Sequence, residues 1–140
     1  MRKRVAAAII TIVFLAGTAS GEDPVYFADE TLKAAVEEAL WVSNPTPTDM
    51  LQLTSLSAGS CGIQSITGLE YATNLESLRL PCNQIGSLSP LSGLENLYKV
   101  VMNNNQISDL SPLSGLSLLE HLDMHDNFLI SNLGPLSGLT

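Results

Sequence analysis

The chain is poor in cations and in cysteine. It has 6 Lys and Arg residues against 14 Asp and Glu residues, a formal net charge of −8. This acidity argues against a nucleic-acid partner and against docking on an anionic membrane surface. The two cysteines, Cys61 and Cys82, lack the C-x-x-C spacing of a zinc or dithiol redox site.

The usual sequence signs of catalysis are also lacking. No serine or cysteine stands in the pattern of a known catalytic triad, and the glycines are spread over turns without forming a phosphate-binding loop. We therefore predict that the protein is not an enzyme and has no cofactor.

The one long apolar run, at residues 5–16, is shorter than the roughly 20 residues that span a membrane. Cations at positions 2–4 precede it and small residues at 17–21 follow it, which is the pattern of a signal peptide. We predict that residues 1–21 are removed before Glu22, or one or two residues earlier; an uncleaved anchor is the alternative. We predict that the cleaved chain does not insert into a membrane. It would keep three cations against 14 carboxylates, a net charge of −11.

A 22-residue step runs through the second half of the chain. Positions that share a residue type recur at this spacing: Leu75, Leu97 and Leu119; Leu78, Val100 and Leu122; Leu80, Met102 and Met124; Asn83, Asn105 and Asn127; Ile85, Ile107 and Leu129. A fixed period of this length indicates a solenoid, in which each coil buries its apolar face against its neighbours.

The repeated pattern is L-x-x-L-x-L-x-x-N-x-I-x-x-L-x-P-L, and residues 102–113 follow it closely. It resembles the leucine-rich repeat, in particular the 22-residue bacterial type of the internalins. The resemblance implies an α/β solenoid with a parallel β-sheet on the concave face, short helical or 3-10 turns on the convex face and an N-terminal helical cap. We predict four repeats, at 53–74, 75–96, 97–118 and 119–140.

The spacing of the pattern agrees with this fold. The second and third leucines of L-x-x-L-x-L are two residues apart, so both point into the coil while the residues between them point outward. The asparagine follows where the chain turns, and there it can satisfy backbone groups that the turn leaves unpaired. We predict an inward structural ladder of Cys61, Asn83, Asn105 and Asn127.

A different pattern fills residues 22–52, the predicted N-terminal cap. Asp29 is suited to cap a helix that runs to about Trp41 and buries one apolar face, formed by Leu32, Val36, Ala39 and Leu40. Either Thr46 or Thr48 begins a second, shorter helix. Trp41 is predicted to lie in the core of the cap.

The other end has no polar final repeat, so we predict that a C-terminal cap is missing. The last copy slips by one residue after Asn127, which places its proline and leucine at Pro135 and Leu136. An open apolar end favours a fragment of a longer protein; the alternatives are end-to-end self-association of two molecules and fraying of the last coil.

Outward residues of the predicted strands form the candidate binding surface. Two of the three cations of the cleaved chain lie there, as do both histidines, so the surface concentrates positive charge on an acidic protein. The candidate partner-binding residues are Ser77, Arg79, Lys99, Val101, Asn103, His121, Asp123 and His125. The alternative is that these are solvated side chains without a partner.

Two further hypotheses concern single groups of side chains. His121, Asp123 and His125 are suitable zinc or copper ligands, but three residues on one flat strand converge poorly and a fourth ligand is lacking. Cys61 and Cys82 lie diagonally on adjacent coils, and a disulfide between them requires side chains that point toward one another.

The primary prediction is an exported bacterial protein, secreted or on the cell surface, that binds a protein ligand or mediates adhesion through the concave sheet face. The first alternative is a spacer or cap region of a larger exported protein whose activity lies elsewhere. The second is metal binding at the His-x-Asp-x-His strand.

Overall fold

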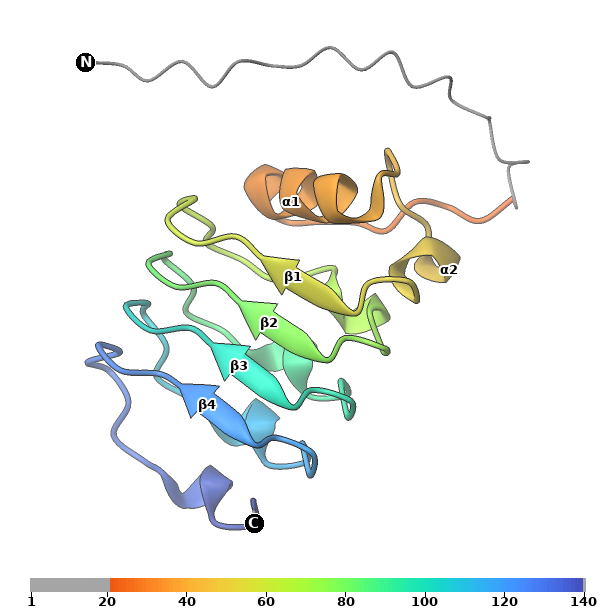
Figure 1. The fold of residues 1–140 in the computed structure, drawn as a ribbon. Helices are drawn as coiled ribbons and strands as arrows, with labels where there is room; N and C mark the ends of the chain where they lie inside the picture. Colours follow the sequence, from red (N-terminus) through yellow and green to blue (C-terminus); the bar gives the residue numbers. More distant parts are fainter. Residues whose placement is uncertain (1–20, 140) are drawn as a thin grey trace, which may run out of the picture.

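A computed structural model describes residues 21–139, and the segment predicted as a signal peptide lies outside them apart from Gly21. Four short strands, β1 (Ser55–Ser57), β2 (Ser77–Arg79), β3 (Lys99–Val101) and β4 (His121–Asp123), form one parallel sheet in chain order (Figure 1). Each residue pairs with the residue 22 positions later. The predicted solenoid and its register are confirmed.

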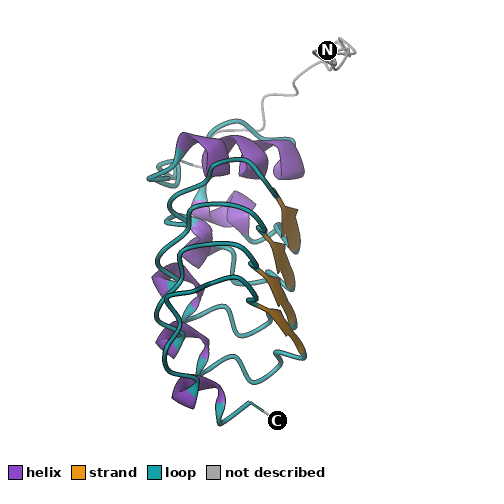
Figure 2. Ribbon diagram, turned by 90° about the vertical axis from the view of Figure 1, so that its left-hand side faces the viewer, coloured by secondary structure: helices purple, strands orange, loops and turns teal. Residues whose placement is uncertain are grey.

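Short 3-10 turns occupy the side of each coil that faces away from the sheet (Figure 2). They are η1 (Leu69–Tyr71), η2 (Ser89–Leu91), η3 (Ser111–Leu113) and η4 (Gly134–Leu136). Proline is the second residue of the last three, where its fixed φ suits the start of a helical turn. Between turns and strands the repeated apolar residues form the core; Leu78 and Val100, for example, are fully buried.

The N-terminal helices begin at the predicted capping residues. The carboxylate of Asp29 accepts hydrogen bonds from the backbone N–H groups of Thr31 and Leu32, at 2.9 and 3.1 Å, and begins α1 (Glu30–Leu40). Of the two threonines predicted to begin the second helix, Thr46 and not Thr48 caps α2 (Pro47–Met50), and it forms a capping box with Asp49. Helix α1 lies beside β1 at the start of the sheet (Figure 1), so it covers the apolar end of the first coil. None of the helices between residues 21 and 139 is long and apolar enough to cross a membrane.

Asp29 also joins the cap to the first coil. Its second carboxylate oxygen accepts a hydrogen bond of 2.8 Å from the backbone N–H of Gln64. Burial by itself would raise the pKa of Asp29, but the hydrogen bonds from Gln64, Leu32 and Thr31 outweigh it and hold the pKa below its ordinary value of 3.8. The ionised carboxylate therefore stabilises the fold.

Replacing this carboxylate should lower the free energy of unfolding at neutral pH and make it depend less on pH in the acid range. We expect Asp29→Ala to lower the free energy of unfolding at pH 7 by about 1–2 kcal/mol, the usual effect of losing a helix cap. Because the folded pKa is depressed, the stabilisation is complete above the ordinary pKa and is lost as the pH falls through the folded value. Urea unfolding between pH 7 and pH 2.5 would check both points, and a wild-type and variant difference that stays constant over this range would contradict the second.

Two predictions for α1 are wrong. Trp41 is not in the cap core; it is 75% exposed. It ends the helix in the left-handed conformation, with φ of 57°, and this turn of the backbone directs the ring away from the core. Ala39 is exposed as well, and Ala35 packs against the core in its place.

The fourth coil also departs from the predicted register. Leu129, placed with Ile85 and Ile107 by the 22-residue step, is 60% exposed. Its neighbour Ile130 packs against the core instead. The one-residue slip after Asn127 therefore takes effect at once, before the proline is reached.

Candidate functional site

The outward side chains of the four strands share the concave surface, as predicted. Ser77 lies beside Lys99, and Lys99 beside His121, in the paired register of β2, β3 and β4. Arg79 and Asp123 flank Val101 in the same way. The candidate residues are thus brought together on one face.

Val101 is the exception on this face. It was predicted as an outward contact residue, but only 7% of it is exposed, between its paired neighbours Arg79 and Asp123. The outward positions contain no aromatic residue. The concave face is therefore polar, with its charged groups around a covered valine.

Both strong cations on the concave face are free of ion pairs. Within residues 21–139, the carboxylate–cation pairs at 4.0 Å or less involve Lys33 with Glu37 and His125 with two aspartates, and none includes Arg79 or Lys99. Arg79 and Lys99 are diagonal neighbours on adjacent strands, and two unpaired cations so placed on a strongly acidic protein create a local positive potential.

Asp123 and His125 form a close pair at the rim of this face. The His125 Nδ1 atom lies 2.6 Å from Asp123 Oδ1, and this hydrogen bond lowers the pKa of the Asp123 carboxyl. His125 Nε2 is also 3.8 Å from a carboxylate oxygen of Asp126. In the part of the chain that the structure describes, no three His, Cys, Asp or Glu side chains are arranged to hold a metal ion. Of the three residues of the predicted metal site, Asp123 and His125 are therefore in contact, and His121 takes no part in that contact.

Buried asparagines support the strands from behind. The Oδ1 atom of Asn105 accepts a hydrogen bond from Ile85 N–H, and its Nδ2 donates to the carbonyls of Leu80 and Met102, all at 3.0 Å. Asn83 and Asn127 repeat the arrangement. Each asparagine therefore bonds the backbone of the preceding coil, not the asparagine of that coil.

Cys61 does not continue this ladder, contrary to prediction. It is exposed, and its Sγ lies 3.2 Å from the carbonyl oxygen of Gly59. The first coil packs on α1 and has no preceding coil, so an inward side chain at this position has no row of backbone groups to bond. Cys82 is exposed as well, and both thiols are free in the structure.

A second ladder, which was not predicted, lies one residue earlier in each coil. Its members share a left-handed backbone with φ near 57°: Ser60, Cys82, Asn104 and Asp126. The signal was present at the last two positions, since asparagine and aspartate tolerate this conformation better than other residues. The ladder turns the chain at one edge of the concave face.

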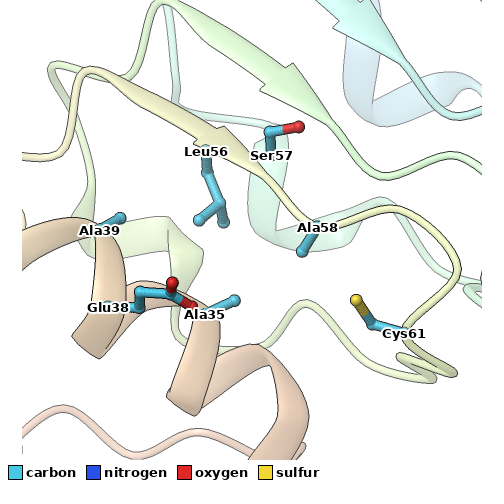
Figure 3. Close-up of a pocket in the computed structure, with 7 residues that line it drawn as sticks. All are labelled: Ala35, Glu38, Ala39, Leu56, Ser57, Ala58 and Cys61. Carbon is cyan, nitrogen blue, oxygen red and sulfur yellow. The ribbon is translucent and has the colours of Figure 1, made fainter. Parts of the chain in front are cut away.

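A shallow hollow lies between α1 and β1. Its volume is about 300 Å³, and Figure 3 shows small apolar side chains around it, with the Cys61 sulfur at one side. The lining residues are Ala35, Glu38, Ala39, Leu56, Ser57, Ala58 and Cys61. It contains one carboxylate and one thiol but no histidine or cation, so it offers no partner for acid–base or nucleophilic chemistry.

Comparison with known proteins agrees with this geometry. Two overlapping segments, 73–115 and 95–138, match the model of leucine-rich repeats in two copies. Among solved structures, internalin C2 of Listeria monocytogenes is 33% identical, with a TM-score of 0.76 over 81% of this chain and 51% of that one. The internalin InlF of the same species is 29% identical, with a TM-score of 0.72 over 87% of this chain and 44% of its own.

A third similar structure comes from a larger protein. It contains the CBM51-2 and INT domains of Clostridium perfringens ZmpB and is 31% identical, with a TM-score of 0.56 over 62% of this chain and 19% of that one. The chain thus spans about half the length of the two internalin structures and a smaller share of the third.

Proposed function

Because the chain belongs to the leucine-rich-repeat proteins of the bacterial internalin type, we propose that it is an exported protein that binds a protein ligand through the concave face of its sheet. Proteins of this family typically act by binding and not by catalysis. The observation that carries the proposal is the pair of free cations, Arg79 and Lys99, on adjacent strands of this face.

These cations define the chemistry of the ligand. An acidic protein repels acidic partners over most of its surface, so two unpaired cations at one place direct such a partner to that place. The neighbouring Ser77, Asn103 and His121 add donors and acceptors for its backbone. The proposed ligand is a protein segment rich in Asp and Glu.

Reversing either charge should abolish most of this binding. We expect Arg79→Glu and Lys99→Glu each to weaken binding of an acidic peptide about tenfold or more, because each change removes an attraction and adds a repulsion. The peptide would be selected by phage display on the wild-type protein, and its affinity measured by isothermal titration at low and at physiological salt.

Lys33→Glu provides the matched control, since it changes the net charge equally but lies on α1. Its affinity for the peptide should stay within about twofold of wild type, given the screening of distant surface charges. Equal losses in all three variants would mean that only the total charge matters, and the concave site would be rejected. Melting curves of each variant would verify folding.

One observation favours the spacer alternative. Strong interfaces are usually anchored by aromatic residues and arginine. The outward positions of the four strands supply Arg79 alone, since the apolar Val101 is covered. If display on the wild-type protein selects no peptide that depends on Arg79 or Lys99, the coils act as a spacer beside a site elsewhere.

Export is the second half of the proposal. The basic start, the apolar run at 5–16 and the small residues at 17–21 support a cleaved signal peptide. N-terminal sequencing of protein recovered from a bacterial culture medium or cell surface should begin at or just before Glu22. Protein that keeps Met1 and stays in the cytoplasm would refute export without affecting the binding proposal.

A further inference from the structure

The hollow between α1 and β1 exists because the first coil has a small residue at a core position. Ala58 stands where the next two coils have Leu80 and Met102, and both of these longer side chains are fully buried. On the helix side of the hollow, Ala35 and Ala39 are equally short. Among the described residues no side chain therefore fills the space of about 300 Å³ between the first coil and α1 (Figure 3).

The hollow has an apolar floor and a polar rim. Leu56 and Ala58 point from the first coil toward the helix (Figure 3) and are only 2% and 7% exposed. Glu38, Ser57 and Cys61 are exposed and surround the opening. Pockets for whole small molecules have volumes of about 300–1,000 Å³, so a hollow at the lower limit suits a single large apolar side chain.

The hollow adjoins the cationic part of the concave face. Ser57, at its rim, pairs with Arg79 on β2, and the next strand carries Lys99. Glu38 lies on the opposite side of the hollow, because it belongs to α1, which lies beside β1 (Figure 1). A ligand seated in the hollow therefore meets positive charge on one side and negative charge on the other.

We propose that the hollow receives one apolar side chain, such as leucine or phenylalanine, from the acidic protein segment that the concave face binds; this inference rests on the proposed function. The Asp and Glu residues of the segment lie on the side of Arg79, because Glu38 repels them on the other side. Neighbouring strands are about 4.8 Å apart and an extended segment advances about 3.3 Å per residue. The apolar residue and the first acidic residue are thus about two or three positions apart.

An inserted side chain supplies the anchor that the concave face lacks. The outward positions of the four strands contain no aromatic residue. Interface hot spots often consist of a large side chain of one partner in a well-packed pocket of the other. Here this protein provides the pocket and the ligand provides the anchor. Burial of one leucine or phenylalanine side chain strengthens binding about tenfold or more.

The two cysteines allow the occupied hollow to be detected. Cys61 lines the hollow and Cys82 does not, and both thiols are free and exposed. A saturating amount of a peptide selected by display should slow the reaction of Cys61 with a maleimide about tenfold, and that of Cys82 less than about twofold, since thiol labelling requires access. Trypsin cleaves after Arg79, between the two cysteines, so mass spectrometry of the digest measures each thiol separately.

Filling the hollow from the helix side is an independent test. Ala39 is exposed, so Ala39→Leu leaves the core of the protein intact and places a good helix former on α1. It should weaken peptide binding about tenfold or more, measured by isothermal titration. Ala34→Leu is the matched control, because Ala34 is exposed on the same helix but does not line the hollow. Its affinity should stay within about twofold of wild type.

The outcomes separate this inference from the proposed function. A peptide that depends on Arg79 and Lys99, but leaves the labelling of Cys61 and the affinity of Ala39→Leu unchanged, would overturn the hollow and retain the acidic ligand. A peptide that protects Cys61 and depends on neither cation would support insertion into the hollow and reject the acidic ligand. If display selects no peptide, both proposals fail. Protection of Cys61 that rises with protein concentration in the absence of peptide would mean that a second copy fills the hollow, and it would overturn the inference.

Discussion

Asn105→Ala should lower the free energy of unfolding by about 3–5 kcal/mol, a large part of the 5–15 kcal/mol typical of a small domain. Asn105 is only 7% exposed and bonds both its own coil and the preceding one. Its removal orphans the buried N–H of Ile85 and takes one hydrogen bond from each of the carbonyls of Leu80 and Met102, which keep those from Asn83 and Asn127. The orphaned N–H costs roughly 1–3 kcal/mol, and each of the two lost hydrogen bonds costs about 0.5–1.5 kcal/mol.

Asn103→Ala is the matched control. Asn103 is the same residue type two positions earlier, but it lies on the concave face, and its backbone carbonyl is its only bonded group among the described residues. We expect a change within about 0.5 kcal/mol, as for most surface substitutions. Urea unfolding followed by circular dichroism would measure both variants. Similar losses in the two would show that the ladder does not stabilise the coils.

Gly68→Ala should have an effect of similar size, about 3 kcal/mol or more, by forcing the cap away from the first coil. A Cβ atom at Gly68 would lie 2.6 Å from Cδ1 and 2.8 Å from Cε1 of Phe27. The ring is buried, with 5% exposed, so it has little room to move. The backbone of Gly68 also has φ of +107°, a conformation that residues with a side chain rarely adopt.

Gly93→Ala is the control that distinguishes this clash from a general effect of replacing glycine with alanine. Nothing lies within 4 Å of the Cβ position at Gly93, and its backbone φ is not in the left-handed range. The melting temperature should therefore stay close to that of wild type. The double variant Gly68→Ala with Phe27→Ala should lose less stability than the two single variants lose together, because removing the ring removes the clash. Strict additivity would mean that the two residues do not interact.

The periodic part of the fold could be predicted because its cause is periodic. Each coil buries the same positions against its neighbours, so the leucines and the asparagines at Asn83, Asn105 and Asn127 repeat in the sequence at the structural step. Local hydrogen-bonding chemistry likewise identified the cap at Asp29 and narrowed the second cap to Thr46 or Thr48, of which the structure has Thr46. In these places one short segment determines its own structure.

Prediction was wrong where the surroundings break the repeat. Trp41 comes directly after the apolar residues of α1 in the sequence. The helix ends at Trp41 in a left-handed turn, which no short sequence pattern predicted. Cys61 occupies the position of an inward asparagine, yet its coil packs on a helix and not on another coil. Leu129 is exposed and not buried, because a single inserted residue shifts the register of every side chain that follows it.

The candidate site shows the same division. The sequence placed Arg79, Lys99 and the other outward residues on one face, because strand alternation alone decides this. It did not indicate that Val101 is covered, or that His125 bonds Asp123 and leaves His121 apart. Burial by neighbours and side-chain rotamers depend on three-dimensional packing, which a residue pattern does not contain.

The bonding of each asparagine to the coil before it makes the protein modular in length. If residues 75–96 were excised, Asn105 would meet the first coil in the place of Asn83, and its hydrogen bonds would find equivalent backbone groups there. Duplication of the same segment would add a coil by the same contacts. Recombination between repeats can therefore lengthen or shorten the binding surface in whole coils while the helical cap and the fourth coil stay unchanged.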